Sequence, residues 1–401
     1  MRTSRTILCL GILASIASSQ GAARENNTED STLREALNET TVAMSLRYRL
    51  ETVDQTGFEE DATANTLKGR LTAKTGAYGK WSGLIEFDYV ADLFDEDFNS
   101  TVNGRSDFPV VADPSGADLN QFSLSYKATD STMLTFGRQR IVHNNQRFVG
   151  GVAWRQNEQT FDAVRVQSTL TSSLKVDYAY SSRVNRIFGS SHPLGDVDGD
   201  LHLINGQYQF RENHRVTGYF YYLDFEQLAA LSSQTMGVEY LFNSKSGLKL
   251  HVGYAAQQDV GDNTDYSANY FVLDGSIQFQ PVTISAGYEV LGSDNGKAFT
   301  TPLATLHKFQ GWADKFLATP ADGIEDSWMS VSGKIDKLAL SLAYHDYQSD
   351  EGDRDLGSEV NIVANYPFNK NVKLTAKYAD YQADEHATDT RKFWLQLFAK
   401  Y

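Results

Sequence analysis

The stretch TVAMSLRYRL, Thr41 to Leu50, alternates apolar and polar side chains with a period of two residues. Its even positions are all apolar or aromatic, whereas its odd positions include Arg47 and Arg49. Successive side chains of an extended strand point to opposite faces, so this segment predicts a strand with one apolar and one basic face. Such a strand fits a soluble sandwich that buries the apolar face, and it equally fits a membrane barrel whose apolar face meets lipid.

Residues 1–23 have the three regions of a secretory signal peptide. Arg2 and Arg5 form a positive start, an apolar run follows from Thr6 to Ala17, and small residues between Ser18 and Ala23 offer cleavage points. The apolar run is too short to span a membrane. The only cysteine, Cys9, lies in this signal, so the mature chain can be neither a disulfide scaffold nor a cysteine-ligated zinc protein.

Composition narrows the class of the mature chain. The 401-residue sequence has a formal net charge of −15, and loss of the signal, with two arginines and no acidic residue, makes the mature chain more acidic still. A strongly acidic exported protein is a poor nucleic-acid binder, so we expect no nucleic-acid partner. Aromatic residues make up 12% of the chain, and no other apolar run is as long as a membrane helix. A soluble periplasmic β-protein and a membrane barrel both remain open at this point.

The connections between the alternating segments favour the barrel. About eighteen period-two segments follow one another, and tight turns alternate with long acidic connections such as 92–120, 142–160 and 292–326. Outer-membrane barrels combine short periplasmic turns with long extracellular loops. We therefore predict an all-β fold: a transmembrane antiparallel β-barrel of about 18 strands over residues 41–401, with both termini in the periplasm of a Gram-negative bacterium. Residues 24–40 do not alternate and form a periplasmic lead-in, where Leu33, Ala36 and Leu37 fit one face of a short helix.

The face opposite the apolar one predicts a basic lumen. With rings and aliphatic side chains turned to lipid, the first seven segments direct a set of cations inward: Arg47, Arg49, Lys68, Arg70, Lys74, Lys127, Arg165 and Lys175. Fewer carboxylates share that face, namely Glu51, Glu86, Asp88 and Asp177. Cations that line a pore favour anions, and arginine binds carboxylates with two donors at once. The competing interpretation is that the lumen charges pair with one another and keep the wall wet.

Two arginines do not follow this parity. Leu134 and Phe136 face lipid, and Arg138 and Arg140 share their parity, so we expect either a bulge at Gly137 or the end of the strand to turn both arginines into the lumen.

An acidic stretch, DVDGD, places Asp196, Asp198 and Asp200 at alternate positions around a glycine. It is similar to part of a calcium loop but lacks the downstream glutamate, so a solvated acidic loop is the simpler interpretation. No other cofactor is expected. Structural Ca²⁺ on such extracellular loops would bridge the phosphates of lipopolysaccharide, which with outer-membrane lipid is an expected partner.

Three passages resemble one family, the alginate-export outer-membrane porins. They are residues 46–57 with 66–90, then LTFGRQRIVHNNQRFVGGVAWRQNEQTFDAVRV at 134–166, and LHKFQGWADKFLATPADGIEDSW at 306–328. The resemblance implies an eighteen-stranded monomer whose arginine- and lysine-rich pore passes an acidic polysaccharide. The second passage contributes Arg138, Arg147, Arg155 and Arg165 to that pore, and the third contributes Lys308, Asp314 and Lys315. The terminal strand, ending in Phe398–Tyr401, looks like the signal that the barrel-assembly machinery recognises.

Both long connections in these passages contain large apolar side chains that would be poorly placed in water. Phe148, Trp154 and Phe161 lie in or beside the first, and Trp312 lies in the second. We expect both connections to fold inward and constrict the barrel, the alternative being that they pack on the outer rim.

These observations predict a passive outer-membrane channel for anionic carbohydrate, either an alginate-like polyuronate or its oligomers. The alternative is a general anion-preferring porin for small solutes. An enzyme is not expected, because a barrel hydrolase needs a serine–histidine pair at the rim and the eight histidines are scattered.

Overall fold

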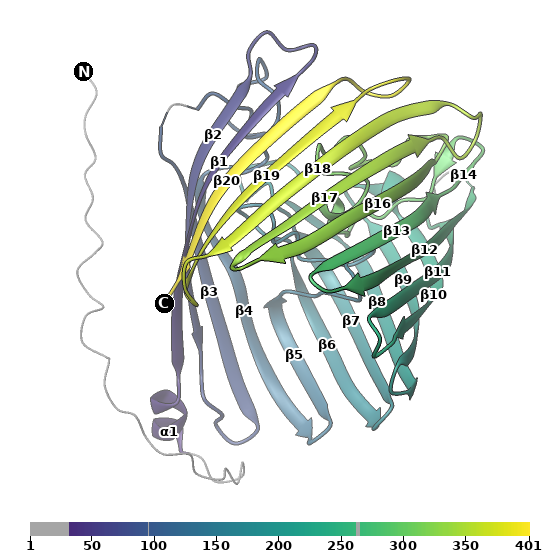
Figure 1. The fold of residues 1–401 in the computed structure, drawn as a ribbon. Helices are drawn as coiled ribbons and strands as arrows, with labels where there is room; N and C mark the ends of the chain where they lie inside the picture. Colours follow the sequence, from purple (N-terminus) through teal and green to yellow (C-terminus); the bar gives the residue numbers. More distant parts are fainter. Residues whose placement is uncertain (1–31, 95, 262–264) are drawn as a thin grey trace, which may run out of the picture.

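The computed structural model describes residues 32–401 except 95 and 262–264, and it shows a closed antiparallel barrel of eighteen strands (Figure 1). Each strand pairs with its neighbours in the sequence, and β1 (Thr41–Gln55) also pairs with β20 (Thr390–Lys400), which closes the ring. The predicted signal peptide and the first part of the lead-in lie outside the described residues. Among the described residues, no helix is long and apolar enough to cross a membrane.

The predicted all-β barrel is confirmed, and the strand bounds follow the alternating segments closely. Between β1 and β20 the strands of the barrel are β2 Ala62–Lys74, β3 Trp81–Asp92, β4 Gly116–Thr129, β5 Thr132–Gln139, β6 Thr160–Thr171, β7 Leu174–Asn185, β8 Asp196–Arg211, β9 His214–Phe225, β10 Ser233–Asn243, β11 Leu248–Asp259, β12 Ser267–Phe279, β13 Val282–Leu291, β16 Ile324–Ile335, β17 Leu338–Gln348, β18 Asp355–Pro367 and β19 Val372–Gln382.

Short and long connections alternate around the ring as the sequence predicts. Turns such as 130–131 and 172–173 lie at the end of the barrel that carries the N-terminal helix, and the long connections 93–115, 140–159 and 292–323 lie at the other end. The last of these contains a small hairpin, β14 (Ser293–Asp294) and β15 (Lys297–Ala298), and a 3₁₀ turn, η2 (Leu306–Lys308). Another 3₁₀ turn, η1 (Ala229–Leu231), follows β9.

The lead-in ends in the short helix that the sequence suggested. Helix α1 (Leu33–Asn38) begins with a capping box, in which Thr32 and Glu35 each bond the other's backbone amide. The buried Ala36 accepts a 3.0 Å hydrogen bond from the amide of Gly76, which holds the helix against the turn between β2 and β3.

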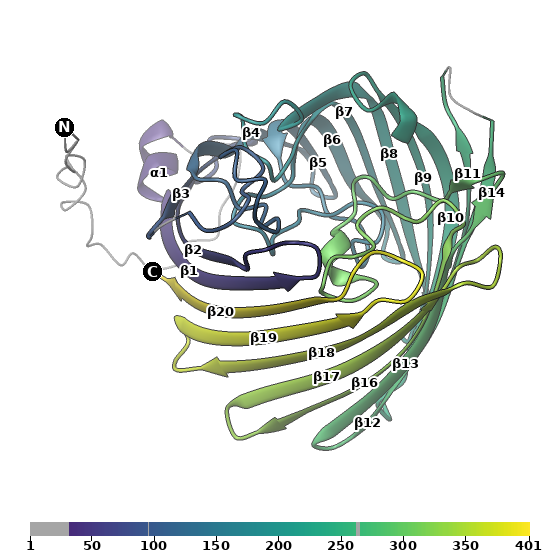
Figure 2. The same cartoon turned by 90° about the horizontal axis from the view of Figure 1, so that it is seen from above.

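The two faces of the wall have opposite character. Large apolar side chains such as Tyr89, Phe122, Leu342 and Phe393 are exposed on the outer face, where lipid would cover them. Inward-facing side chains become more buried towards the end with the long connections; on β1, for example, Ser45 is half-buried and Glu51 is fully buried. The main buried cluster therefore lies inside the ring, between the wall and the long connections that enter it (Figure 2).

Candidate functional site

Two connections fold into the barrel and meet there, as the inward-folding interpretation predicted. We call them the first inner segment, residues 140–159, and the second inner segment, residues 299–317. Val149 and Leu303 form a parallel β-bridge, and the amide of Gly150 donates a 2.9 Å hydrogen bond to the carbonyl of Leu303. The amide of Thr305 donates to the carbonyl of Gln146 at 3.0 Å. The two segments therefore form one body inside the half of the lumen that carries the long connections.

The two arginines of β1 anchor the first inner segment. Arg47 donates to the carbonyl of Ala153 at 2.8 Å and to the side chain of Gln156 at 2.9 Å. Arg49 is fully buried, donates to the carbonyl of Trp154, and lies with its guanidinium 4.3 Å from the centroid of that ring. These inward-facing cations bond protein groups, so their first role is to hold the constriction in place.

A group of ion pairs joins the wall strands β2 and β3 to the first inner segment. Arg70 lies 2.9 Å from Glu158, and Arg140 bonds both Glu158 and Glu86, the latter at 3.1 Å. Burial raises the pKa of Glu158, but the charges of Arg70 and Arg140 outweigh it and lower the pKa to about 2. This carboxylate is therefore ionised throughout the physiological range.

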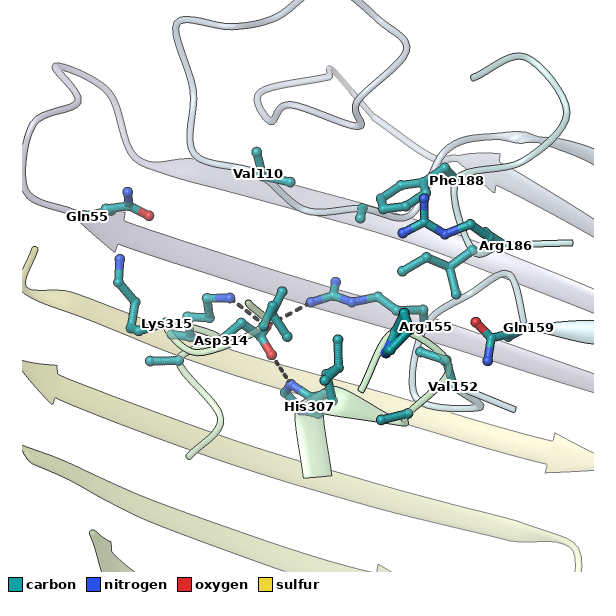
Figure 3. Close-up of a pocket in the computed structure, with 18 of the residues that line it drawn as sticks. Gln55, Val110, Val152, Arg155, Gln159, Arg186, Phe188, His307, Asp314 and Lys315 are labelled. Atoms are coloured by element: carbon teal, nitrogen blue, oxygen red, sulfur yellow. Dashed lines mark hydrogen bonds and ion pairs between the residues drawn. The ribbon is translucent and has the colours of Figure 1, made fainter. Parts of the chain in front are cut away.

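A second cluster of charged and polar side chains surrounds Asp314 in the second inner segment (Figure 3). Arg155 lies 3.2 Å and Lys392 2.7 Å from one carboxylate oxygen, and the Nδ1 of His307 lies 2.6 Å from the other. The Nζ of Lys377, on β19, lies 2.6 Å from the Nε2 of His307. Burial lowers the pKa of His307 to about 3, against the opposing charge of Asp314.

Three tryptophan rings enclose the ammonium group of Lys377. Its Nζ lies 3.8 Å from the ring centroid of Trp312, 4.3 Å from that of Trp154 and 5.3 Å from that of Trp394. Cation–π contacts of this kind are strongest where water is excluded. Lys377, Lys392 and Trp394 lie beyond the first seven segments, from which the predicted lumen cations come. The same inward parity, continued along β19 and β20, includes all three.

The opposite wall of the lumen is aromatic, which the predicted basic lumen did not include. Phe148 packs against Tyr219 and Tyr270, with ring centroids 4.9 and 5.3 Å away. Arg147 crosses this apolar region to reach Glu289 at 2.9 Å. The signal was present in the sequence, since Tyr219 and Tyr221 on β9 have the parity opposite to that of Tyr222.

Most of the predicted lumen cations have carboxylate partners. This agrees with the interpretation that the lumen charges pair with one another. Arg49 pairs with Asp113, Lys68 with Asp88, Arg165 with Asp177, and Arg155 with Glu51. Lys175 has no carboxylate within 4.0 Å among the described residues, and it lines a cavity with Arg165 and His143. Lys308 donates to the carbonyl of Asn145 at 2.7 Å, and Lys315 donates to Thr390 at 2.8 Å.

Two positions correct the sequence prediction. Arg138 does not line the pore: its cross-strand neighbours are Phe122, which is exposed on the outer face, and Asp162, whose carboxylate lies 2.8 Å away. The register is regular at Gly137 and β5 ends at Gln139, so only Arg140 turns inward. Phe161 is buried as expected, but it lies within β6 rather than in the constricting connection.

The acidic stretch also differs from its prediction. Asp196, Asp198 and Asp200 lie in β8, not in a loop. Arg183 pairs with Asp198 at 2.6 Å and Asp196 at 3.4 Å, and the hydroxyl of Tyr180 donates to Asp200 at 2.7 Å. Over residues 32–401, apart from the undescribed gaps, no group of three His, Cys, Asp or Glu side chains is arranged to hold a metal ion.

Among the described residues, two cavities contact different parts of the first inner segment. A cavity of about 360 Å³ opens among the long connections and contacts Val152, Arg155 and Gln159. A cavity of about 340 Å³ contacts Val142, His143 and Asn144, and it is also lined by the parts of β6 and β7 nearest their short turn. We call these two cavities the vestibules of the lumen.

Comparison with known families decides the class of this pore. The family described as alginate export matches residues 38–302. The chain belongs to the alginate export family. The match includes the first two resembling passages and ends before the third, at 306–328. No curated protein sequence matches significantly.

Solved structures similar to this member of the alginate export family are outer-membrane porins. OccAB4 of Acinetobacter baumannii has a TM-score of 0.71 at 16% identity, over 94% of this chain and 100% of that one. OpdO of Pseudomonas aeruginosa has a TM-score of 0.70 at 13% identity, over 92% and 98%. OpdK from the same organism, solved with vanillate, has a TM-score of 0.71 at 13% identity, over 91% and 99%. At such identities the similarity shows the fold alone. Together with the family match, it indicates an outer-membrane transport channel rather than an enzyme.

Proposed function

We propose that this protein is a passive channel for small carboxylated solutes, including uronate monomers and short oligomers. The observation that carries the proposal is that cations without carboxylate partners face both vestibules. Lys315 and Arg186 line the extracellular cavity, Lys175 lines the lower one, and none has a carboxylate within 4.0 Å among the described residues. Unpaired cations on both sides of a constriction attract anions to it and let them leave again.

The ion selectivity of the purified channel in a planar bilayer tests this proposal. Under a salt gradient we expect the reversal potential to have the sign that indicates anion selectivity. Lys74→Glu with Lys175→Glu should shift it towards cations, because both side chains face the periplasmic half of the lumen and neither has a carboxylate partner in the described structure. Lys245→Glu is the matched control, since Lys245 lies in an exposed turn beside Glu212. A cation-selective wild type, or an unchanged potential in the double variant, would contradict the proposal.

A second candidate is translocation of a long polyuronate, which membership of the alginate export family favours. A polymer would need more room than the two vestibules offer, so both inner segments would have to leave the lumen. For either candidate we expect a monomer inserted in lipid and lipopolysaccharide by the barrel-assembly machinery, since pairing of β1 with β20 leaves no free strand edge.

A further inference from the structure

The extracellular cavity is lined by both apolar and basic side chains (Figure 3). It lies among five connections and the ends of β1 and β20, and its volume is about 360 Å³. Its apolar lining includes Phe58, Val110, Val152, Ile187, Phe188 and Leu317. A volume of this size accommodates a small organic molecule.

The cations of this cavity outnumber its carboxylates. Arg155, Arg186, Lys315 and Lys392 line it, whereas Asp314 is the only acidic side chain in the lining. Asp314 is already bonded by Arg155 and Lys392. Arg186 and Lys315 thus face the cavity with their charge uncompensated. Burial, together with the charge of Lys392, lowers the pKa of Lys315 to about 8, as expected for an ammonium group in a basic, partly dry site.

Neither of these two cations is held tightly by other groups. The Nη1 of Arg186 lies 3.5 Å from the carbonyl of Leu194, and its guanidinium lies 4.7 Å from the ring centroid of Phe188. The Nζ of Lys315 donates to the hydroxyl of Thr390. Each cation keeps donors for a bound anion, and the ring of Phe188 orients the guanidinium beside the apolar wall.

We infer that this cavity binds an organic monocarboxylate with an apolar body, such as an alicyclic acid, at the extracellular entrance. This inference rests on the proposed carboxylate channel and specifies the class of solute that its entrance prefers. The carboxylate of the ligand would pair with Lys315 or Arg186, and its apolar part would pack against the aliphatic and aromatic side chains of the cavity. A polyhydroxylated ring of the same charge would leave hydroxyl groups against those walls without hydrogen-bond partners, which opposes its binding.

Equilibrium binding to the purified full-length channel in detergent tests the inference without requiring transport. Calorimetric titration would compare cyclohexanecarboxylate, glucuronate and uncharged cyclohexanol. We expect cyclohexanecarboxylate to bind at least about tenfold more tightly than either of the others, because only it satisfies both the cations and the apolar walls. Equal affinity for cyclohexanecarboxylate and glucuronate, or no binding of the former, would overturn the inference.

Two variants separate the two parts of the site. Lys315→Gln should weaken cyclohexanecarboxylate about tenfold, whereas Lys245→Gln, which removes a distant cation, should not. Ile187→Ser should weaken cyclohexanecarboxylate and leave glucuronate unchanged. An affinity that neither Lys315→Gln nor Ile187→Ser alters would place binding elsewhere and refute the site. The reversal potential is measured separately, so an anion-selective channel that does not prefer the apolar acid would disprove this inference alone.

Discussion

Among single residues, Gly311 controls whether the second inner segment can lie against the wall. Its φ is 77°, and a Cβ built there would clash with the carboxylate of Glu359 and the hydroxyl of Tyr347. The same carboxylate accepts hydrogen bonds from the amides of Trp312 and Ala313, the second at 2.8 Å. The glycine therefore permits the close approach by which Glu359 holds the segment.

We expect Gly311→Ala to push the second inner segment away from β18 and raise the single-channel conductance. The matched control is Gly296→Ala: Gly296 lies in the same connection, has a φ of 73°, and has open space at its Cβ position. Both variants carry the backbone cost of a left-handed alanine, about 1 kcal/mol, but only the first adds the clash. Equal conductance in the two variants would show that the contact with Glu359 does not hold the segment.

Single residues also show where the alternating pattern of the sequence succeeds and where it fails. It places Arg47 and Arg49 inside correctly, because parity alone fixes the face of a strand residue. It does not find their partners, since Asp113, Ala153 and Trp154 lie in connections without a period. For Arg138, the expectation of a bulge at Gly137 was wrong, because the ladder stays in register to the end of β5.

At the scale of elements, η2 and the residues after it are held by a neutral histidine. His307 stacks on Trp154, with ring centroids 4.9 Å apart, and its two nitrogens face Lys377 and Asp314. A neutral ring can accept from Lys377 at Nε2 and donate to Asp314 from Nδ1, whereas a protonated ring would direct an N–H at the ammonium group. Protonation therefore opposes the closed arrangement.

We expect acid to loosen the second inner segment. The pKa of His307 is about 3 in the closed arrangement and near 6.5 when the segment is released. The stabilisation is fully present above pH 6.5 and falls by about 1.4 kcal/mol per pH unit as the pH drops from 6.5 towards 3. Hydrogen exchange of residues 300–317 should be faster at pH 5 than at pH 7, after correction for the intrinsic rate. His307→Asn, which cannot titrate, should remove the difference; the same pH dependence in that variant would assign the effect to another group.

At the scale of the whole molecule, the strand number, the alternation of turns and long connections, and the two faces of the wall could all be predicted from the sequence. Each depends on local periodicity and chain order, which the barrel preserves because every strand pairs with its sequence neighbours. The interior could be predicted only in part. That the connections enter the lumen follows from their apolar side chains, but which groups they meet depends on closure of the ring, which brings β1 beside β20.

The architecture of the whole barrel also distinguishes the two candidate functions. Passage of a polymer requires the two inner segments to move apart, whereas passage of a small acid does not. Val149 and Leu303, which form the bridge between the segments, are both buried, and the only natural cysteine lies outside the described residues. Val149→Cys with Leu303→Cys should therefore form a disulfide that locks the segments together. In liposome swelling we expect oxidation to change the rate for galacturonate by less than about twofold, since the proposed passage of a small acid does not require the segments to separate. Uptake of a long polyuronate, if the channel passes one, should fall on oxidation and return on reduction. A channel that passes a long polyuronate equally well when oxidised would show that the inner segments do not limit solute size, and one that stops passing galacturonate would show that small acids also need them to separate.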